Sequence, residues 1–238
     1  MKSIESVKDI IEKVNEQKQI NLNSGEKSDL IFRGQNYGYN LIPRLMRYKN
    51  ISNLEKLVLA EFRRLSLPLI PGEPKDDFDW VVLAQHYGLP TRLLDWTYNP
   101  LSALWFSINM VRSEGCRENV SKASIWVFRP SLQDYQKQQN YDGNIYELVD
   151  NIVYRPRNLT SRIINQSSIF TIHNINNNIP LEDDDSFKGK LIQYVINNRN
   201  EDQILEELHV MNINESTIYP DLQGLCKHLK WRYFERSD

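Results

Sequence analysis

Short apolar runs that suit β-strands lie scattered among amphipathic helical segments in this 238-residue chain, and the two kinds of segment do not alternate regularly. Residues 30–33, 124–128, 168–172 and 191–196 are rich in β-branched, aromatic and other apolar residues, which favours strands. Apolar residues at helical spacing dominate near both ends of the chain. Because a parallel βαβ fold needs regular alternation, the pattern predicts an α+β domain with a mixed or antiparallel sheet flanked by helices.

The segments are joined without a linker rich in proline, glycine and serine, which favours one compact domain over two. We expect residues 1–27 to form an N-terminal helix and loop, and residues 28–238 to form the main domain. The first helix has its apolar residues on one face, with Ser3 as the expected N-cap. Cap residues mark five further helix starts: Ser52 with Glu55, Asp77, Asn99 with Pro100, Asn200 with Gln203, and Asp221.

Charge, cysteine content and hydropathy exclude several classes of protein. The net charge is −2, so the chain as a whole is not a basic nucleic-acid-binding domain. Two cysteines cannot supply a disulfide framework or a cysteine-based zinc site. The first residues lack the pattern of a secretory signal, and no apolar run approaches the roughly 20 residues that span a bilayer. We therefore expect a cytoplasmic protein that does not bind membranes.

The first unusual polar group is Phe32-Arg33-Gly34-Gln35, at the end of an expected buried strand. An arginine in that place loses hydration unless an anion or a carboxylate meets its guanidinium. Gly34 permits a turn and the close approach of a ligand. Two interpretations stay open: Arg33 binds an anionic ligand, or it pairs within the protein with Asp95.

A second polar group follows the third expected helix. His86 lies in the last helical turn, where the helix dipole favours its protonated form. Thr91, Arg92 and Asp95 come next, interleaved with large apolar residues, which is typical of a satisfied buried network or of a ligand pocket. We expect these side chains to converge with Arg33 around one cleft. We also expect Arg92 or Asp95 to form a buried charge pair with another residue of this segment.

A third group, Arg162 and Gln166, precedes the strand expected at residues 168–172. A glutamine in this place orients a ligand or forms part of a turn, and both interpretations stay open. The sequence contains no phosphate-binding glycine loop, no H-E-x-x-H and no G-x-S-x-G nucleophile elbow. Its four histidines are far apart along the chain, so we expect no metal site.

The Phe-Arg-Gly tripeptide at residues 32–34 and the run His-Tyr-Gly-Leu-Pro-Thr-Arg-Leu-Leu-Asp-Trp-Thr at residues 86–97 resemble the FRG domain, a family named for that tripeptide. Shorter similarities extend the resemblance over most of the chain, from about residue 28 to residue 230. They lie at Arg162, Gln166, Phe170 and residues 219–225.

A looser resemblance connects this pattern with the arginine-type ADP-ribosyltransferases, in which an early strand ends in an aromatic-Arg-Gly sequence whose arginine holds NAD. It implies an NAD- or nucleotide-handling enzyme, either an ADP-ribosyltransferase or an NAD glycohydrolase, with a toxin or phage-defence effector as its setting. NAD would be a substrate, with no tightly bound cofactor. The implied roles are binding by Arg33, Gly34, Gln35, Thr91 and Arg92, and catalysis by His86, Asp95 and Gln166. Gln166 stands where these transferases have a glutamate.

Two other classes of function fit the same residues. A non-catalytic module would bind a nucleotide or a nucleic acid through arginines interleaved with aromatic residues, although the net charge does not support a nucleic acid. A protein-interaction domain would use the same motif only for its architecture. Binding of NAD or of a small nucleotide separates the enzyme from the interaction domain.

Overall fold

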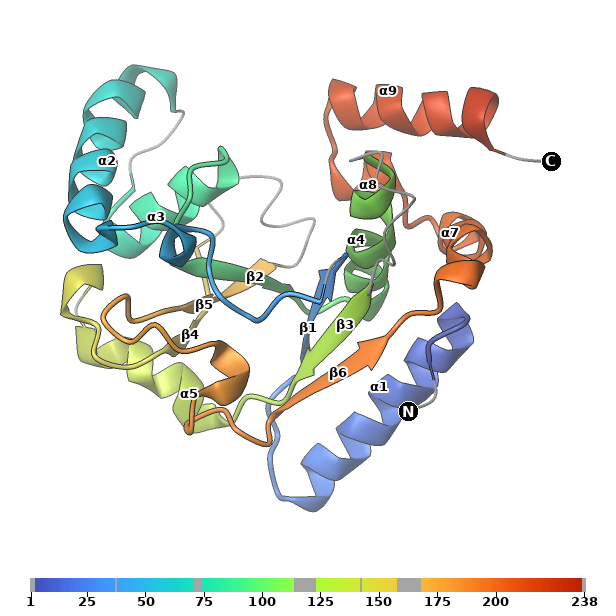
Figure 1. The fold of residues 1–238 in the computed structure, drawn as a ribbon, viewed down its shortest axis with the longest axis horizontal. Helices are drawn as coiled ribbons and strands as arrows, with labels where there is room; N and C mark the ends of the chain where they lie inside the picture. The colour runs from blue at the N-terminus through green and yellow to red at the C-terminus, as the bar shows by residue number, and fades with distance from the viewer. Residues whose placement is uncertain are drawn as a thin grey trace.

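The computed structural model describes residues 3–36, 38–70, 74–113, 123–141, 143–157 and 168–236 (Figure 1). Within these ranges six strands form one sheet, in the order β4-β5-β2-β1-β3-β6. All neighbouring strands are antiparallel, which confirms the predicted α+β class. The strands are β1 (Ile31–Gln35), β2 (Leu93–Thr97), β3 (Ser124–Phe128), β4 (Ile152–Tyr154), β5 (Ser168–Ile172) and β6 (Leu191–Val195).

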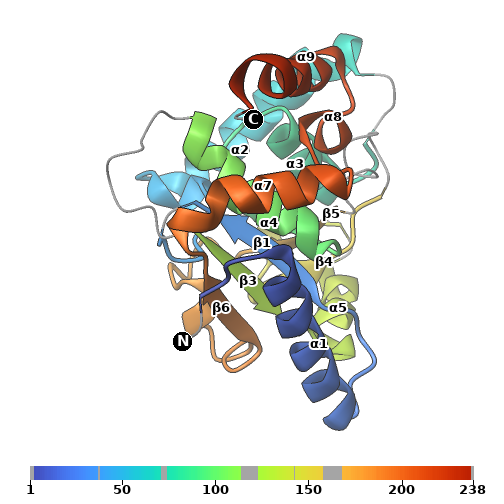
Figure 2. The ribbon, with the colours of Figure 1, turned by 90° about the vertical axis from the view of Figure 1, so that its right-hand side faces the viewer.

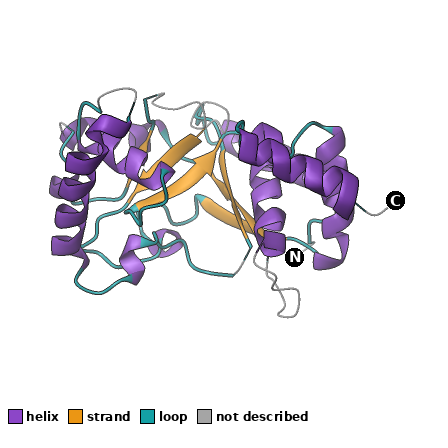
Figure 3. Ribbon diagram, turned by 90° about the horizontal axis from the view of Figure 1, so that it is seen from above, coloured by secondary structure: helices purple, strands orange, loops and turns teal. Residues whose placement is uncertain are grey.

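Eight α-helices lie in the described ranges, and Figure 3 shows most of them in two groups with the strands between. In these ranges no helix combines the length and the apolar character that a bilayer-spanning segment needs. The helices are α1 (Val7–Asn23), α2 (Ile51–Ser66), α3 (Asp77–His86), α4 (Pro100–Ser113), α5 (Leu132–Gln136), α7 (Glu201–Val210), α8 (Glu215–Ile218) and α9 (Leu222–Lys230).

Two separate apolar cores cover one face of the sheet. The first packs Phe32, Ile125 and Val127 of β1 and β3 against α1, α4 and α7. Figure 2 shows α1 and α7 over this half of the sheet. The second core packs Leu93 and Phe170 of β2 and β5 against α2 and α3. The boundary between the two cores therefore falls between the central strands β1 and β2.

The opposite face of the sheet carries a third core. Side chains alternate between the two faces of a strand, so residues next to those of the first two cores point here. Trp96 and Trp126 contribute from β2 and β3, and Leu41, Leu181 and Phe187 cover them from loops and turns. Apolar side chains consequently cover much of both faces of the central strands.

The N-terminal helix packs into the first core through Val7 and Ile10, and it ends at Asn23. Its N-cap is Ser6, whose hydroxyl accepts a hydrogen bond from the Asp9 N–H at 3.2 Å. The expectation of a cap at Ser3 is wrong. The reason is a β-bridge between Ile4 and Ile196, which keeps the chain extended beside β6 before the helix begins.

Other helix starts follow the sequence with two exceptions. Asn99 and Asp221 cap α4 and α9 as predicted, accepting hydrogen bonds from the N–H groups of the first helical turn. The cap of α3 is Asp76, one residue earlier than expected. The capping box expected for α2 is wrong: Asn50 precedes that helix in a left-handed conformation, and the Glu55 side chain turns into the protein.

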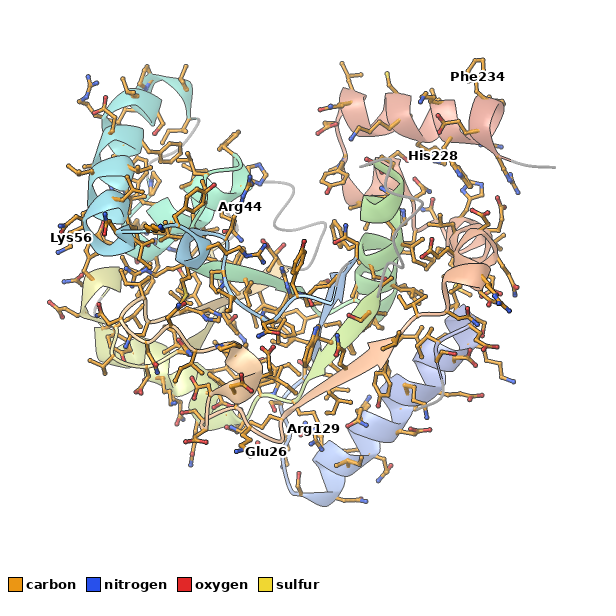
Figure 4. The ribbon with its side chains drawn as sticks, in the orientation of Figure 1. Glu26, Arg44, Lys56, Arg129, His228 and Phe234 are labelled. Carbon is orange, nitrogen blue, oxygen red and sulfur yellow. The ribbon has the colours of Figure 1, made fainter. Side chains whose placement is uncertain are left out.

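The C-terminal helix rests on the domain through an aromatic cluster. The His209 ring of α7 lies 5.4 Å from the His228 ring of α9 and 5.0 Å from the Trp231 ring, measured between centroids. His228 is buried, whereas Phe234 is 84% exposed, and Figure 4 shows the two side chains on opposite sides of this helical end. Residues 222–235 are thus anchored on one side, and their other side reaches solvent.

Candidate functional site

The sheet divides between its two central strands. β1 pairs with β3 over five residue pairs, and β2 pairs with β5 over five. Between β1 and β2, Phe32 and Thr97 form the one pair in register that the structure describes. Beyond this pair the two strands diverge (Figure 1). We call this end of β1 and β2, where Arg33 and Asp95 lie, the divide.

Arg33 bridges the divide. Its Nη1 donates a hydrogen bond to the backbone oxygen of Asp95 at 2.7 Å. The same Nη1 lies 3.8 Å from Oδ2 of the Asp95 carboxylate, with the Arg33 side chain 20% exposed and the Asp95 side chain 62% exposed. A separation of 3.8 Å is too long for a direct hydrogen bond. Arg33 therefore contacts Asp95, as one of the two interpretations expected, but the carboxylate does not fully pair with it.

The positive charge of Arg33 is incompletely compensated. Burial lowers the pKa of its guanidinium, Asp95 raises that pKa, and the neighbouring Arg47 lowers it further. The Arg33 Nε is buried and has no hydrogen-bond partner in the described part of the chain. A guanidinium carries five N–H donors in one plane, and it suits phosphate and carboxylate groups.

A short series of hydrogen bonds holds the Asp95 carboxylate. Gln85 of α3 donates from Nε2 to Asp95 Oδ2 at 2.8 Å. The Oε1 of Gln85 accepts a hydrogen bond from the buried Thr91 hydroxyl, just before β2. These hydrogen bonds thereby keep the carboxylate in one orientation beside Arg33. The sequence analysis did not select Gln85, although its place beside His86 in the central motif was a usable signal.

His173 adds a buried imidazole at the end of β5. Burial lowers its pKa to about 3, with smaller contributions from the cations Arg33 and Arg92. Its Nε2 lies 3.2 Å from the Thr171 hydroxyl, which accepts a hydrogen bond from Trp96 Nε1 at 3.1 Å. The Nδ1 atom has no partner among the described residues, so this buried imidazole keeps one ring nitrogen unpaired.

The Arg92 side chain forms its contacts elsewhere in the fold and does not join Arg33 and Asp95. Its guanidinium is 2% exposed and donates to both carboxylate oxygens of Glu55 and to the Ile145 backbone oxygen. A buried charge pair was expected for Arg92 or Asp95, and it exists. The partner was expected within the central segment, and this is wrong, because Glu55 comes from α2. We therefore assign Arg92 to the packing of α2 against β2.

Gly34 and Gln35 both contact other parts of the protein. A Cβ atom on Gly34 would lie 2.0 Å from the Ala103 backbone oxygen and 2.7 Å from the Ser107 nitrogen, so the glycine allows α4 to approach β1. The close approach that we expected there is made by a helix. Gln35 is 8% exposed, and its Oε1 accepts a hydrogen bond from Trp126 Nε1 at 2.9 Å.

The remaining predicted residues lie at the edge of this group or beyond it. His86 is half-buried at the end of α3, next to Gln85, with its ring 4.8 Å from the Tyr87 ring. Arg162 and Gln166 lie outside the described residues, so their roles stay predictions. No three histidine, cysteine or acidic side chains of the described ranges gather as metal ligands would.

The segment that contains both β1 and β2 also matches a protein-family model. Residues 28–116 match the FRG domain. The matched segment includes β1, α2, α3, β2 and α4, and with them Arg33, Gln85, Thr91 and Asp95. His173 follows it in the chain. No curated protein and no solved structure matches this chain.

The three residues of the tripeptide in the FRG domain have three different surroundings. Phe32 packs in the first core, Arg33 enters the divide, and Gly34 lies under α4. Three consecutive residues of β1 thus contact the apolar core, the polar site and α4. The similarity beyond residue 116, and the similarity to ADP-ribosyltransferases, stay predictions.

Proposed function

We propose that the divide binds NAD or a closely related anionic nucleotide, and that the chain acts on the N-glycosidic bond to nicotinamide. The observation that carries the proposal is the Arg33 guanidinium, which is 20% exposed and lies 3.8 Å from its carboxylate partner, too far for a direct hydrogen bond. A mostly buried cation whose carboxylate partner is this distant is incompletely compensated. Phosphate oxygens match the fork of a guanidinium and form strong, charge-assisted hydrogen bonds with it. Arg33 is accordingly the phosphate contact.

In this proposal the Asp95 carboxylate lies beside the ribose that is bonded to nicotinamide. Its side chain reaches solvent next to Arg33, and Gln85 holds it in one orientation. When the bond between C1′ and the ring nitrogen breaks, the electron pair stays with the nitrogen, and nicotinamide leaves as a neutral molecule. Positive charge then develops on the ribose, and a fixed carboxylate stabilises it. Water or another acceptor bonds to C1′, and its proton passes to Asp95 and then to solvent.

The test compares the unaltered protein with Arg33→Lys, which keeps the charge but loses the planar fork. Calorimetric titration with ADP-ribose and NAD should show binding to the unaltered protein. Removing charge-assisted hydrogen bonds should weaken binding by about tenfold or more in Arg33→Lys. The matched control is Arg64→Lys, which changes an exposed arginine paired with Glu61 on α2. Arg64→Lys should bind both ligands as the unaltered protein does. The rate of nicotinamide release from NAD should fall in Arg33→Lys and stay unchanged in Arg64→Lys.

Two results would contradict this function. The first is that the unaltered protein binds neither NAD nor ADP-ribose. The second is a clear fall in the melting temperature of Arg33→Lys together with no change in nucleotide affinity, which would make Arg33 a structural link between β1 and β2. Binding of ADP-ribose without any release of nicotinamide would leave a non-catalytic nucleotide-binding module.

A further inference from the structure

A cavity of about 170 Å³ lies between α2 and α3, beside the segment that leads into β2. Apolar side chains form most of its wall, among them Leu54, Val58 and Ala84. Leu54 is 41% exposed and Val58 is 37% exposed, so they form a rim that a ligand can reach from solvent. Ala84 is buried and lies deeper in the wall.

The cavity carries little net charge although Glu55 borders it. Both carboxylate oxygens of Glu55 accept hydrogen bonds from Arg92, so that carboxylate is already paired. The other polar groups in the wall are Tyr48 and Thr91. An apolar wall with a few hydroxyl groups suits a neutral ring that bears a small polar substituent.

Hydrogen bonds connect this cavity with the divide. Thr91 borders the cavity and donates to Gln85, and Gln85 donates to Asp95 at 2.8 Å. Asp95 is in turn 3.8 Å from Arg33. Cavity, carboxylate and guanidinium therefore follow one another in the order in which base, sugar and phosphate follow one another in a nucleotide.

We infer that this cavity receives the nicotinamide ring of the nucleotide, an inference that rests on the proposed function. Its volume supports one ring, because a dry protein cavity of about 150 Å³ is known to hold benzene. The ring is cationic in NAD and neutral after the bond to C1′ has broken. An apolar wall favours the neutral ring, while Asp95 favours the charge that moves to the sugar. Cavity and carboxylate thus both stabilise the products of bond cleavage.

The experiment places a large side chain at the rim of the cavity. Val58→Trp narrows the mouth at a position that is partly exposed, so the fold should tolerate it. Its matched control is Leu57→Trp, on the next residue of α2, which is 70% exposed and does not border the cavity. Both variants and the unaltered protein are titrated with nicotinamide, NAD and ADP-ribose, which lacks the ring. Melting temperatures verify that all three proteins are folded.

Val58→Trp should lower the affinities for nicotinamide and NAD by about tenfold, since the ring loses its apolar contacts, and should leave ADP-ribose binding unchanged. Leu57→Trp should match the unaltered protein with all three ligands. An equal fall for NAD and ADP-ribose would overturn the inference, because adenine would then occupy the cavity. Unchanged binding of all three would also overturn it, yet the proposed function would stand. Failure of the unaltered protein to bind both NAD and ADP-ribose would instead refute the proposed function.

Discussion

Arg33 Nη1 donates a hydrogen bond to the Asp95 backbone oxygen at 2.7 Å, where β1 and β2 have stopped pairing. A side chain here satisfies a strand carbonyl that a neighbouring strand would satisfy elsewhere in the sheet. The same guanidinium keeps an unpartnered Nε in the divide. A structural contact and the proposed phosphate contact are therefore combined in one residue.

Asp95→Asn should separate catalysis from stability. Asp95 is 62% exposed, and exposed ion pairs contribute little, so the free energy of unfolding should change by less than about 1 kcal/mol. Nicotinamide release should fall because the neutral amide cannot stabilise positive charge on the ribose. Urea unfolding and a nicotinamide assay measure the two effects. A large loss of stability with normal turnover would show that the carboxylate serves the fold.

Glu55→Gln should strongly destabilise the protein. It leaves Arg92, which is 2% exposed, without a carboxylate partner. Breaking a buried ion pair on one side costs about 3–5 kcal/mol, which urea unfolding would measure. The control on the same helix is Glu61→Gln, which removes an exposed pair with Arg64 and should leave stability unchanged. Equal effects of the two substitutions would contradict the structural role assigned to Arg92.

His173 should make stability depend on pH below neutrality. Its pKa is lowered from 6.5 to about 3 in the folded protein, so the unfolded chain takes up a proton that the fold excludes. The contribution of His173 to the free energy of unfolding is fully present above pH 6.5 and is lost as the pH falls from there toward 3. Between about pH 7 and pH 5 this loss amounts to about 2 kcal/mol.

The pH experiment uses His173→Gln as its reference. Glutamine keeps a hydrogen-bonding group next to Thr171 but does not titrate in this range. Urea unfolding of both proteins at the two pH values should give a smaller change for the variant, since all carboxylates are common to both. Identical pH dependence in the two proteins would show that the imidazole is accessible to protons in the folded state.

Gly34→Ala should disrupt the packing of α4. The added Cβ would lie 2.0 Å from the Ala103 backbone oxygen, and a backbone atom cannot move aside as a flexible side chain can. Overpacking of this kind costs about 1–3 kcal/mol or more. Thermal unfolding would measure the loss. A variant with unaltered stability would place α4 further from β1 than the structure does.

Local patterns in the sequence were sufficient for several strands and helix caps. Residues 124–128 and 168–172 form the predicted strands, because β-branched and aromatic side chains suit a sheet that is buried on both faces. β2 was not predicted as a strand. Its polar residues interrupt the apolar pattern, and its conformation depends on pairing with β5, which is distant in the chain. β4 was missed as well, being three residues long in an irregular stretch.

The sequence alone determined the α+β class, a buried strand that carries Arg33 and the contact between Arg33 and Asp95 as one of two options. These depend on residue type and short spacing, which local chemistry controls. The expectation that the buried strand ends at Arg33 is wrong, because β1 continues through Gly34 to Gln35, where it still pairs with β3. Only the tertiary structure decided that Arg92 pairs with Glu55, that Gly34 faces α4 and that His173 is buried beside two arginines. Residues far apart in the chain make these contacts, and several partners compete for each buried charge. The packing of the whole domain selects among them, because each buried cation needs an acceptor that no local pattern specifies.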